Sequence, residues 1–562
     1  MNLNLKSKEQ STFDAIIVGS GISGGWAAKE LCEKGLKVLL LDRGGNVVHP
    51  NYPTATLDPW DFPHRLKLTP EDKEKSYVQS RHYSFRDDNK HWYINDKENP
   101  YTETKRFDWI RGDVVGGRSL LWGRLCYRWS DLDFEANARE GIAVDWPIRY
   151  KDIAPWYDYV ESFIGVSGRA DGIAHLPDGK FMPPFEMNCV EKSFKGRIEE
   201  KFPGRKVTIG RTANLTQPVK GRGQCQNRNL CHRGCPYGAY FSTNASTLPA
   251  AFATGNLTLK AHTLVNRVLY DEQKQRAAGV EVLDIETNQT QEFYSRIVFL
   301  NAATAATSFI LLNSVSSRFP NGFGNSSDQV GRNLMDHHKC QGFSGRAEGF
   351  DDRYYSGNRP VGIYIPRFRN IKERRTDFLR GYGVQGGAGR EGWQRSDERM
   401  GIELKEALTQ PGPWNMNFSG YGECLPYSEN RITLNTDKKD KWGRPTLTID
   451  CEFKENEKSM QKDMATSVAE MMEAAGFRDL KTEASMSFPG NANHEMGTAR
   501  MGKDPKTSVL NSYNQMHDVP NVFITDGSCM TSSSCVNPSL TYMALTARAC
   551  DYAVSELKRT NL

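Results

Sequence analysis

The feature that most constrains this chain is a glycine-rich turn between a buried strand and a helix. The apolar residues 15–18 are typical of a strand inside a parallel sheet. The sequence GSGISG (residues 19–24) follows directly and fits the pattern G-x-G-x-x-G. Residues 22–34 are predicted to form a helix that ends at Gly35, and residues 37–42 a second strand. Strands joined by such a crossover helix indicate a parallel sheet.

Each glycine of this turn has a physical role in binding a dinucleotide. Gly19 permits the tight turn, Gly21 lets the backbone approach a pyrophosphate, and Gly24 lets the helix pack closely on the strand. The helix N-terminus favours the diphosphate through its free N–H groups and its dipole. Asp42 ends the second strand, where a carboxylate can accept a hydrogen bond from a ribose hydroxyl. The turn therefore predicts a dinucleotide site, but does not distinguish NAD from FAD.

The bulk composition is that of a globular enzyme with a large core. The chain has 562 residues, of which 38% are hydrophobic and 25% charged, and this length favours more than one domain. No apolar run reaches the about 18 residues of a transmembrane helix, and the start, MNLNLKSKEQSTF, lacks the apolar segment of a secretory signal. The net charge of +5 includes no basic stripe interleaved with aromatics, which argues against nucleic-acid binding. We expect a cytoplasmic protein, or a periplasmic one if a signal-bearing partner exports it.

Two polar residues near the C-terminus are candidates for redox catalysis. They are His494, in NHEMGTARMG, and Asn537, in SSCVNPSLTYMAL. Taken alone, such a histidine is more often structural, and an asparagine before proline is more often a helix cap. Alcohol oxidation, however, needs a base for the hydroxyl proton while hydride leaves carbon, and a histidine with a pKa of ~6.5 suits that role. The asparagine amide can hold the same oxygen in place.

Three of the twelve cysteines are clustered as C-x5-C-x3-C followed by proline: Cys225, Cys231 and Cys235. Three thiolates on one short loop can bind a 3Fe–4S cluster. The alternatives are a zinc site with His232 as fourth ligand, or three unligated thiols. Arginines flank the loop and would compensate an anionic cluster, form a docking rim or be solvated surface: Arg222, Arg228 and Arg233. We assign no disulfides.

Several segments together resemble the glucose–methanol–choline family of FAD-dependent oxidoreductases over nearly the whole chain. They are FDAIIVGSGISGG, DVVGGRSLLWG, VGRNLMDHH, GECLPYSENRITL, HEMGTARMG and NVFITDGSCMTSSSCVNPSLT. The resemblance implies an α/β fold with a Rossmann-like FAD-binding domain on a parallel sheet. It also implies a substrate domain built on a mostly antiparallel sheet, which short alternating segments in 341–450 favour independently.

The resemblance also implies how the chain is divided. The FAD-binding domain would be discontinuous and comprise residues 1–48, 106–130, 205–340 and 488–562. The substrate-binding domain and its decorations would comprise residues 49–105, 131–204 and 341–487.

By the same resemblance, residues along the whole chain would contact FAD. Gly19, Gly21 and Gly24 would meet the diphosphate, Asp42 (usually Glu in the family) the ribose, and Val265 the adenine. The remaining contacts would lie near the isoalloxazine ring, the ribityl chain and the diphosphate: Gly116, Gly117, Ser119, Trp122, Asp526, Gly527 and Asn537. Some sugar oxidases of the family link the flavin to a histidine in the 116–122 loop. Leu121 stands at the likely equivalent position, so non-covalent FAD is implied.

The resemblance further implies a reaction. His494 would accept the hydroxyl proton, Asn537 would orient the substrate, and flavin N5 would accept the hydride. The cysteine loop is similar to that of cytochrome-linked sugar dehydrogenases, and the chain is also similar to bacterial glucoside 3-dehydrogenases. These likenesses imply oxidation of a sugar or glycoside secondary hydroxyl, at C3 of glucosides, to a ketone, with electrons passing through a 3Fe–4S cluster to a cytochrome-type acceptor.

Other readings stay open. One is an oxygen-using oxidase without a cluster, and another is a hydroxynitrile lyase that binds FAD without redox chemistry. A non-catalytic flavoprotein and an NAD-dependent enzyme are further alternatives. Three residues are plausible sugar contacts, with core packing as the alternative for the two aromatic ones: Glu423, Trp414 and Tyr421. His337 and His338 are expected to be structural.

Overall fold

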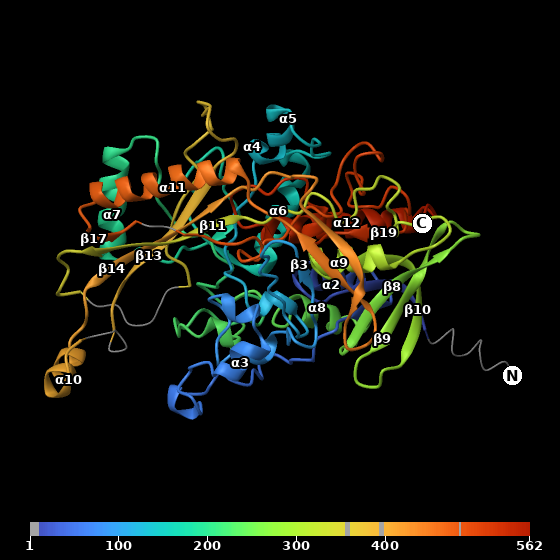
Figure 1. Ribbon diagram of the computed structural model, residues 1–562, viewed down its shortest axis with the longest axis horizontal. Helices are drawn as coiled ribbons and strands as arrows, with labels where there is room; N and C mark the ends of the chain where they lie inside the picture. Colours follow the sequence, from blue (N-terminus) through green and yellow to red (C-terminus); the bar gives the residue numbers. More distant parts are fainter. Residues whose placement is uncertain (1–10, 354–359, 393–397, 483–484) are drawn as a thin grey trace.

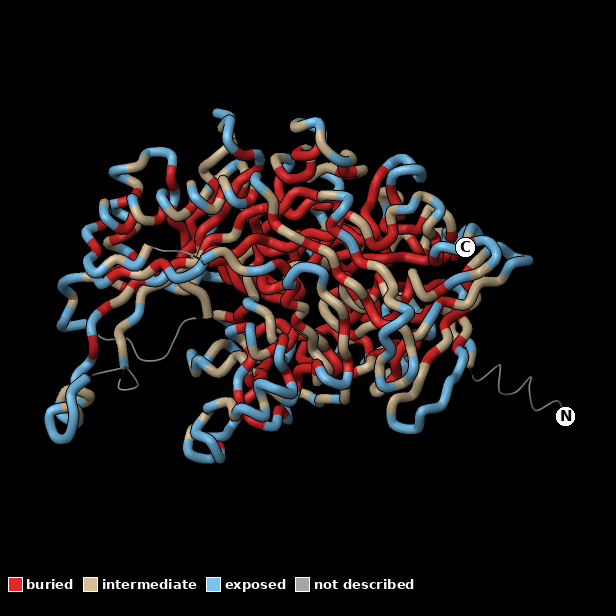
Figure 2. Tube along the Cα trace, viewed as in Figure 1, coloured by how far each residue is buried: buried red, intermediate tan, exposed pale blue. Residues whose placement is uncertain are grey.

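Two seven-stranded sheets lie one after the other along the long axis of the molecule (Figure 1). The computed structural model describes residues 11–353, 360–392, 398–482 and 485–562, so the predicted absence of a signal in the first ten residues lies outside the described part. Within the described ranges, buried residues fill both halves and exposed residues gather on the protruding loops (Figure 2). No described helix is both long enough and apolar enough to cross a membrane.

The first sheet contains the predicted β-α-β unit. Strands β7, β2, β1, β10 and β19 are mutually parallel, and β9 and β8 extend the sheet antiparallel from β10. The predicted parallel sheet is therefore confirmed for this core, and the full sheet is mixed. The bounds are β1 Thr12–Val18, β2 Val38–Leu41, β7 Leu257–Lys260, β8 Thr263–Asp271, β9 Arg276–Asp284, β10 Thr290–Leu300 and β19 Val522–Ile524.

Helices pack against this sheet and against one another. The C-terminal helix α12 (Ser539–Lys558) contacts α2 (Ile22–Glu33) and α6 (Tyr150–Ile164). Its apolar residues at helical spacing, such as Met543 and Ala547, are fully buried, as the periodicity predicts. Helix α8 (Thr247–Ala253) packs on α2, and α9 (Thr304–Asn313) follows β10 and packs on β8. The two ends of the chain thus build one layer.

The second sheet is antiparallel, as predicted, and carries helix α11 (Glu455–Ala474) on one face and helix α7 (Cys189–Lys201) beside it. Its order is β17-β11-β14-β13-β12-β6, with β18 also on β11. The bounds are β6 Thr208–Ile209, β11 His338–Ala347, β12 Ile363–Ile365, β13 Tyr382–Arg390, β14 Trp414–Gly422, β17 Arg478–Lys481 and β18 Ser485–Met486. The predicted domain boundaries stay a prediction. Strand β6 belongs to this second sheet, whereas the sequence predicts that residues 205–340, which include β6, belong to the cofactor domain.

Smaller elements complete the fold. A three-stranded sheet contains β15 (Arg431–Lys439), β16 (Pro445–Asp450) and β3 (Thr102–Glu103), and β4 (Val166–Ser167) pairs with β5 (Phe181–Met182). The short helices are α3 Pro70–Lys75, α4 Asp131–Phe134, α5 Ala136–Glu140 and α10 Gly401–Thr409. The 3-10 turns are η1 Pro59–Asp61, η2 Gln79–Arg81, η3 Lys90–Trp92, η4 Gly117–Leu120, η5 Cys231–Arg233 and η6 Gly527–Cys529.

The glycines between β1 and α2 have the roles that their spacing predicts. Gly19 has φ +91°, and a Cβ there would lie 2.4 Å from the Asn301 carbonyl oxygen. A Cβ on Gly24 would lie 1.7 Å from the Gly19 carbonyl oxygen, whereas a Cβ on Gly21 would meet no atom within 4 Å. Gly19 and Gly24 therefore allow the close packing of α2, and Gly21 leaves open space for a ligand.

Replacing Gly24 by alanine should destabilise the protein, because the neighbouring carbonyl belongs to the backbone and cannot rotate away. We expect Gly24→Ala to lower the free energy of unfolding by about 1–3 kcal/mol or more. Gly196→Ala is the matched control: it also lies within a helix, but its Cβ would meet no atom within 4 Å, so it should be neutral or stabilising. Differential scanning calorimetry checks both, and a Gly24→Ala protein as stable as Gly196→Ala would contradict the packing role.

Candidate active site

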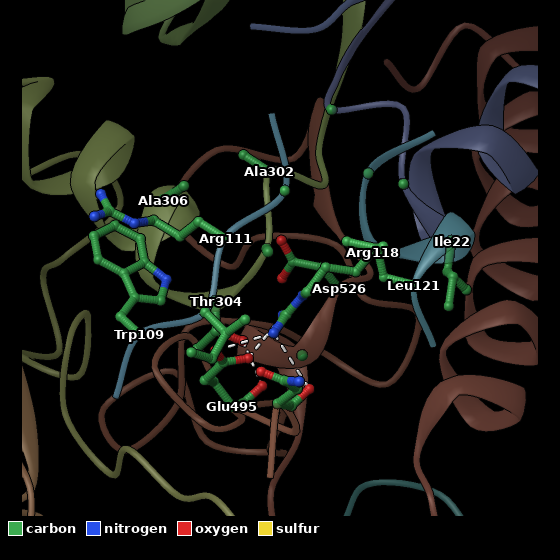
Figure 3. Close-up of a pocket in the computed structure, with 18 of the residues that line it drawn as sticks. Ile22, Trp109, Arg111, Arg118, Leu121, Ala302, Thr304, Ala306, Glu495 and Asp526 are labelled. Atoms are coloured by element: carbon green, nitrogen blue, oxygen red, sulfur yellow. Dashed lines mark hydrogen bonds and ion pairs between the residues drawn. The ribbon is translucent and has the colours of Figure 1, made fainter. Parts of the chain in front are cut away.

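A single cavity of about 410 Å³ lies between the two sheets and contains most of the predicted site. Its walls include the glycine turn, the 116–122 loop, the N-terminus of α9 and the segments around His494 and Asn537. Figure 3 shows Ile22, Arg118, Leu121, Thr304, Glu495 and Asp526 converging on this cavity from different parts of the chain. Residues far apart in the sequence thus meet in one site.

Two helix N-termini open into the cavity. Helix α2 begins at Ile22 after the glycine turn, and α9 begins at Thr304. Free N–H groups and the helix dipole make such ends favourable for an anion. Asn301 also lines the cavity, and its Nδ2 makes no hydrogen bond with the described chain, while its Oδ1 accepts from Thr525. An unsatisfied donor beside two helix ends fits a bound diphosphate.

Asp42 anchors the glycine turn as well as facing the cavity. Its Oδ2 accepts from Ser20 N at 2.8 Å and from Ser20 Oγ at 2.5 Å, and its Oδ1 accepts from Gly44 N at 2.8 Å. Burial raises the pKa of Asp42, and these hydrogen bonds oppose that rise. Val265 lines the same cavity from β8. Both residues therefore line the same cavity as the glycine turn.

The 116–122 loop lies directly against the glycine turn. Gly116 has φ +97°, and a Cβ there would lie 1.9 Å from Asn244 Oδ1. A Cβ on Gly117 would lie 3.4 Å from the Cα of Gly21. Ser119 Oγ donates to the Gly116 carbonyl at 2.6 Å, and Trp122 Nε1 donates to the Phe241 carbonyl at 2.9 Å. The paired glycines thus permit the loop backbone to pass close to the glycine turn, and Leu121 lines the cavity.

An ion pair ties this loop to the C-terminal segment. Arg118 Nη2 donates to Glu495 Oε2 at 2.7 Å, and Thr304 Oγ1 donates to the Glu495 carbonyl at 2.6 Å (Figure 3). A Cβ on Gly527 would lie 2.2 Å from that same carbonyl, so only glycine fits there. Asp526 lines the cavity and accepts from Thr307 Oγ1 at 2.6 Å. The positions predicted near a cofactor are therefore brought together.

His494 and Asn537, predicted as a catalytic pair, do meet. Asn537 Nδ2 lies 3.4 Å from His494 Nε2, and both side chains line the cavity. Gln385, on β13, donates from Nε2 to Asn537 Oδ1 at 2.7 Å. That bond orients the Asn537 amide so that its N–H₂ group points towards His494.

His337 determines which nitrogen of His494 carries the proton. His337 Nε2 lies 3.1 Å from the Ser533 carbonyl, which can only accept, so this nitrogen is protonated. Burial lowers the pKa of His337 to about 4, so the ring is neutral and its Nδ1 accepts. His337 Nδ1 lies 2.9 Å from His494 Nδ1, which must therefore donate. His494 Nε2 is left unprotonated and faces the cavity as a base.

The surroundings keep His494 neutral and fixed. Burial is the main cause that holds the pKa of His494 well below its usual range, and the neighbouring His337 and Arg118 add to it. Asp336 accepts from His494 N at 3.0 Å and from Ala492 N at 3.1 Å, which holds the backbone of this segment. A positioned neutral imidazole is suited to accept a proton.

The three suggested sugar contacts have different surroundings. Tyr421 lines the cavity, and its ring centroid lies 6.1 Å from that of His494. Glu423 is buried in an ion pair with Arg367 at 2.9 Å. Trp414 is buried in the core of the second sheet and donates to the Phe350 carbonyl. Only Tyr421 is therefore placed to touch a substrate.

The cysteine loop forms a second, smaller cavity. Cys225, Cys231 and Cys235 all line it, together with Tyr240. Within the described residues, no group of three or more Cys, His, Asp or Glu side chains is arranged to hold a metal ion. His232, the suggested zinc ligand, instead pairs with Asp88 at 2.7 Å. Three cysteine thiols are the type of ligand that an iron–sulfur cluster uses. The zinc alternative loses its fourth ligand, because His232 is bound to Asp88.

The flanking arginines do not form a solvent-exposed docking surface around the cysteine loop. Arg222 donates to the carbonyls of Gly238 and Ile164, and Arg233 pairs with Asp88. Both side chains are buried, whereas Arg228 is half-buried. Arg222 and Arg233 thus hold the loop in place, and the docking role suggested for them has no support in the fold.

Three functional candidates carried no recognised sequence signal. His337 was expected to be structural, Gln385 lies in an unremarkable strand, and Lys339 follows the histidine pair. The adjacent histidines in MDHH were the only sequence signal for His337. Its functional role follows only from the tertiary contact with His494.

Comparison with known proteins identifies the family. The sequence profiles for the N- and C-terminal parts of GMC oxidoreductases match residues 13–339 and 426–546. The chain belongs to the GMC oxidoreductase family. It is accordingly an enzyme, an oxidoreductase that acts on CH–OH groups, and the cradle, the unsatisfied donor and the neutral base described above fit that chemistry.

Relatives of this GMC oxidoreductase match over nearly their full length. It is 27% identical to the fructose dehydrogenase large subunit of Gluconobacter japonicus, covering 98% of this chain and 100% of that protein. It is 26% identical to 2-methyl-1,2-propanediol dehydrogenase of Mycolicibacterium austroafricanum, covering 96% and 94%. It is 25% identical to the gluconate 2-dehydrogenase flavoprotein of Pantoea cypripedii, covering 96% and 93%.

Solved structures share the fold. Pyridoxine 4-oxidase from Mesorbium loti superposes with a TM-score of 0.60 at 16% identity, covering 96% of this chain and 99% of that one. A variant of formate oxidase from Aspergillus oryzae superposes with a TM-score of 0.62 at 16% identity, covering 98% and 99%. The predicted fold class is therefore confirmed.

We expect His337→Leu to slow substrate oxidation by about tenfold or more, because His494 loses the acceptor that selects its tautomer. His337→Gln should retain more activity, since an amide can accept from His494 and donate to Ser533. The ¹⁵N NMR shifts of His494 report the tautomer directly and should show Nδ1 protonated and Nε2 unprotonated in the wild type. A protonated Nε2, or a Leu variant with unchanged shifts and rate, would contradict this role.

Proposed function

We propose that this GMC oxidoreductase is an FAD-dependent dehydrogenase that oxidises a secondary hydroxyl of a sugar or glycoside, at C3 of glucosides, to a ketone. One observation carries the proposal: an unprotonated His494 Nε2 and the Asn537 amide line the same cavity as the glycine turn. A base beside a dinucleotide cradle is what oxidation of an alcohol requires.

The residues present fit FAD bound without a covalent link. Gly19, Gly21 and Gly24 would hold the diphosphate, Asp42 the ribose and Val265 the adenine. The flavin end would lie among Gly116 and the cavity-lining positions Gly117, Ser119, Trp122, Asp526, Gly527 and Asn537. FAD supplies the two-electron acceptor for the hydride of the substrate. Leu121 lines this end of the cavity, which supports non-covalent binding.

The chain itself supplies the proton chemistry. His494 Nε2 accepts the proton of the substrate hydroxyl, and its neutral state makes it available over the physiological pH range. Asn537 Nδ2 points to the same place and can donate to the substrate oxygen, which would fix the carbinol carbon. His337 holds the second nitrogen of the base and acts through His494.

Sugars are favoured as substrates by two observations. The relatives named above include a fructose dehydrogenase subunit and a gluconate 2-dehydrogenase flavoprotein. The substrate end of the cavity also combines the aromatic ring of Tyr421 with the polar groups of Gln385 and Asn537. Aromatic faces with convergent polar groups suit polyhydroxylated ligands.

We further propose that Cys225, Cys231 and Cys235 hold a 3Fe–4S cluster that passes electrons to a cytochrome-type acceptor. The three thiols share one small cavity. Tyr240 lines that cavity, Arg124 lines the large one, and the Arg124 guanidinium lies 5.3 Å from the Tyr240 ring. A single residue contact therefore joins the two sites, which supports an electron path between them.

An oxidase without a cluster is the second candidate, because some relatives are named oxidases, among them paromamine 6'-oxidase of Streptomyces fradiae. It predicts hydrogen peroxide and no iron. A fructose dehydrogenase large subunit among the relatives favours a multi-subunit dehydrogenase instead. A small signal-bearing partner would then place this chain in the periplasm.

His494→Ala should keep bound flavin and reduce the rate of anaerobic flavin reduction by sugar on the order of 10²–10⁴-fold, the usual worth of a positioned base. In the wild type the rate should stay constant near neutral pH and fall only at lower pH, because the pKa of His494 is lowered. Stopped-flow absorbance measures both. Unchanged bleaching by the Ala variant, or a colourless wild type that takes up no FAD, would overturn the function.

Cys231→Ser should retain sugar-driven flavin reduction but slow electron transfer to an external acceptor, because the cluster would lose a ligand. Cys189→Ser, outside the loop, is the matched control and should leave both steps unchanged. Iron analysis and the steady-state rate with a one-electron acceptor are the measurements. A wild type without iron, together with equal turnover by Cys231→Ser, would remove the cluster and leave the flavin chemistry intact.

A further inference from the structure

Lys339 is a buried cation that lines the active-site cavity. It is the second residue of β11 and is 4% exposed. Its ammonium makes no hydrogen bond or ion pair with any residue that the structure describes, although its backbone groups are bonded to Ser487. A buried ammonium without a partner is costly, so its persistence in a cavity wall points to a ligand.

The neighbours of Lys339 do not neutralise it. Its Nζ lies 4.3 Å from the ring centroid of Tyr83 and 6.0 Å from that of Tyr421. Asp336 is the carboxylate that acts on it, but its oxygens already accept the backbone N–H groups of Ala492 and His494. Burial lowers the pKa of Lys339 to about 8, so the side chain is mostly charged at neutral pH. His82 and His494 nearby are both neutral, since burial lowers their pKa values too.

Arg124 adds a second positive charge to the same cavity. Its Nη1 donates to the Trp122 carbonyl at 2.7 Å, and its buried Nε has no partner among the described residues. Tyr83 lies near both cations: burial raises the pKa of Tyr83, the charge of Arg124 opposes that rise, and the Lys339 ammonium lies over the Tyr83 ring. Arg118, by contrast, is neutralised by Glu495. The uncompensated charge therefore belongs to Lys339 and Arg124.

This charge lies close to the reacting pair. Tyr421 is a neighbour of both groups: its ring centroid lies 6.0 Å from the Lys339 ammonium and 6.1 Å from the His494 ring centroid. A molecule of about the size of one sugar ring can therefore reach His494 with a hydroxyl and Lys339 with another substituent.

We propose that Lys339, supported by Arg124, binds a carboxylate of the substrate, so that among sugars and glycosides this enzyme prefers those that bear a carboxylate, such as glucosiduronic acids, over neutral ones. The inference rests on the proposed function and specifies its substrate class. The Lys339 ammonium and the Arg124 Nε–H, which line the same cavity, are both donors of the kind that carboxylate oxygens accept, and the bond to a charged group adds affinity that a neutral hydroxyl lacks.

The test compares molecules that differ only in charge. Methyl glucosiduronic acid and its primary amide have the same hydroxyls and nearly the same size. With FAD-loaded protein under anaerobic conditions, the acid should reduce the flavin with an apparent Kd about tenfold or more below that of the amide, the usual worth of a charge-assisted hydrogen bond. In the wild type this advantage should decline above about pH 8, because Lys339 loses its charge there.

Variants of Lys339 separate charge from packing. Lys339→Gln and Lys339→Met should both reduce the acid-to-amide preference to about one, whereas Lys339→Arg should retain it and should keep it above pH 8. Lys458→Gln, an exposed lysine paired with Glu455, is the matched control and should leave the preference unchanged. Thermal unfolding and bound FAD are measured for each variant, so that a lost preference is not confused with a lost fold.

Several results would overturn the inference without touching the flavin chemistry. One is a wild type that neutral methyl glucoside or the amide reduces as well as the acid does. Another is a Lys339→Gln protein that binds FAD more weakly but keeps the preference once it is saturated with added FAD, which would make Lys339 a cofactor contact. If no sugar of either kind reduces the flavin, the proposed function fails instead. Calorimetric binding of tetrahydropyran-2-carboxylate against its carboxamide, neither of which bears a hydroxyl, then still decides whether the cavity selects an anion.

Discussion

A directional chain of hydrogen bonds is the constraint on which the site depends. It begins at the Ser533 carbonyl, which can only accept, and passes through His337 to His494. From the other side, Gln385 orients the Asn537 amide towards the same imidazole. The contact with His337 places the His494 proton on Nδ1, and the Asn537 amide donates towards Nε2, so both contacts require His494 Nε2 to be unprotonated. The fold thus prepares a base before any substrate arrives, and no proton has to be redistributed first.

Burial determines the electrostatics of this cavity. Removal from water disfavours charge, so it lowers the pKa of His82, His337 and His494 and raises that of Asp336 to about 7. Neutral histidines serve proton transfer. Lys339 experiences the same penalty but stays mostly charged, and Asp336 is committed to backbone groups. One physical cause thus yields both a neutral base and a cation without a protein partner in the same cavity.

Local sequence patterns predicted the cofactor cradle well. The packing role of Gly24 follows from a contact within one β-α-β unit, where its Cβ would meet the Gly19 carbonyl, whereas the limit at Gly19 comes from the distant Asn301. Patterns predicted other positions poorly. Glu423 and Trp414 resembled sugar contacts but lie in an ion pair and in the core of the second sheet, because residue type alone does not tell which face of a strand meets a cavity. His232 was a possible ligand until Asp88, distant in sequence, was found bound to it.

The sequence by itself determined the β-α-β unit, the glycine turn and the family, because each depends on residues within a short stretch or on motifs that occur in order. It also singled out His494 and Asn537, which lie 43 residues apart. Only the tertiary structure decided that His337 meets His494 across 157 residues, that Gln385 holds Asn537 across 152, and that Lys339 is buried without a partner. The physical reason is that hydrogen-bond direction and desolvation depend on which distant segments meet, and the spacing of residues along a chain does not contain that information.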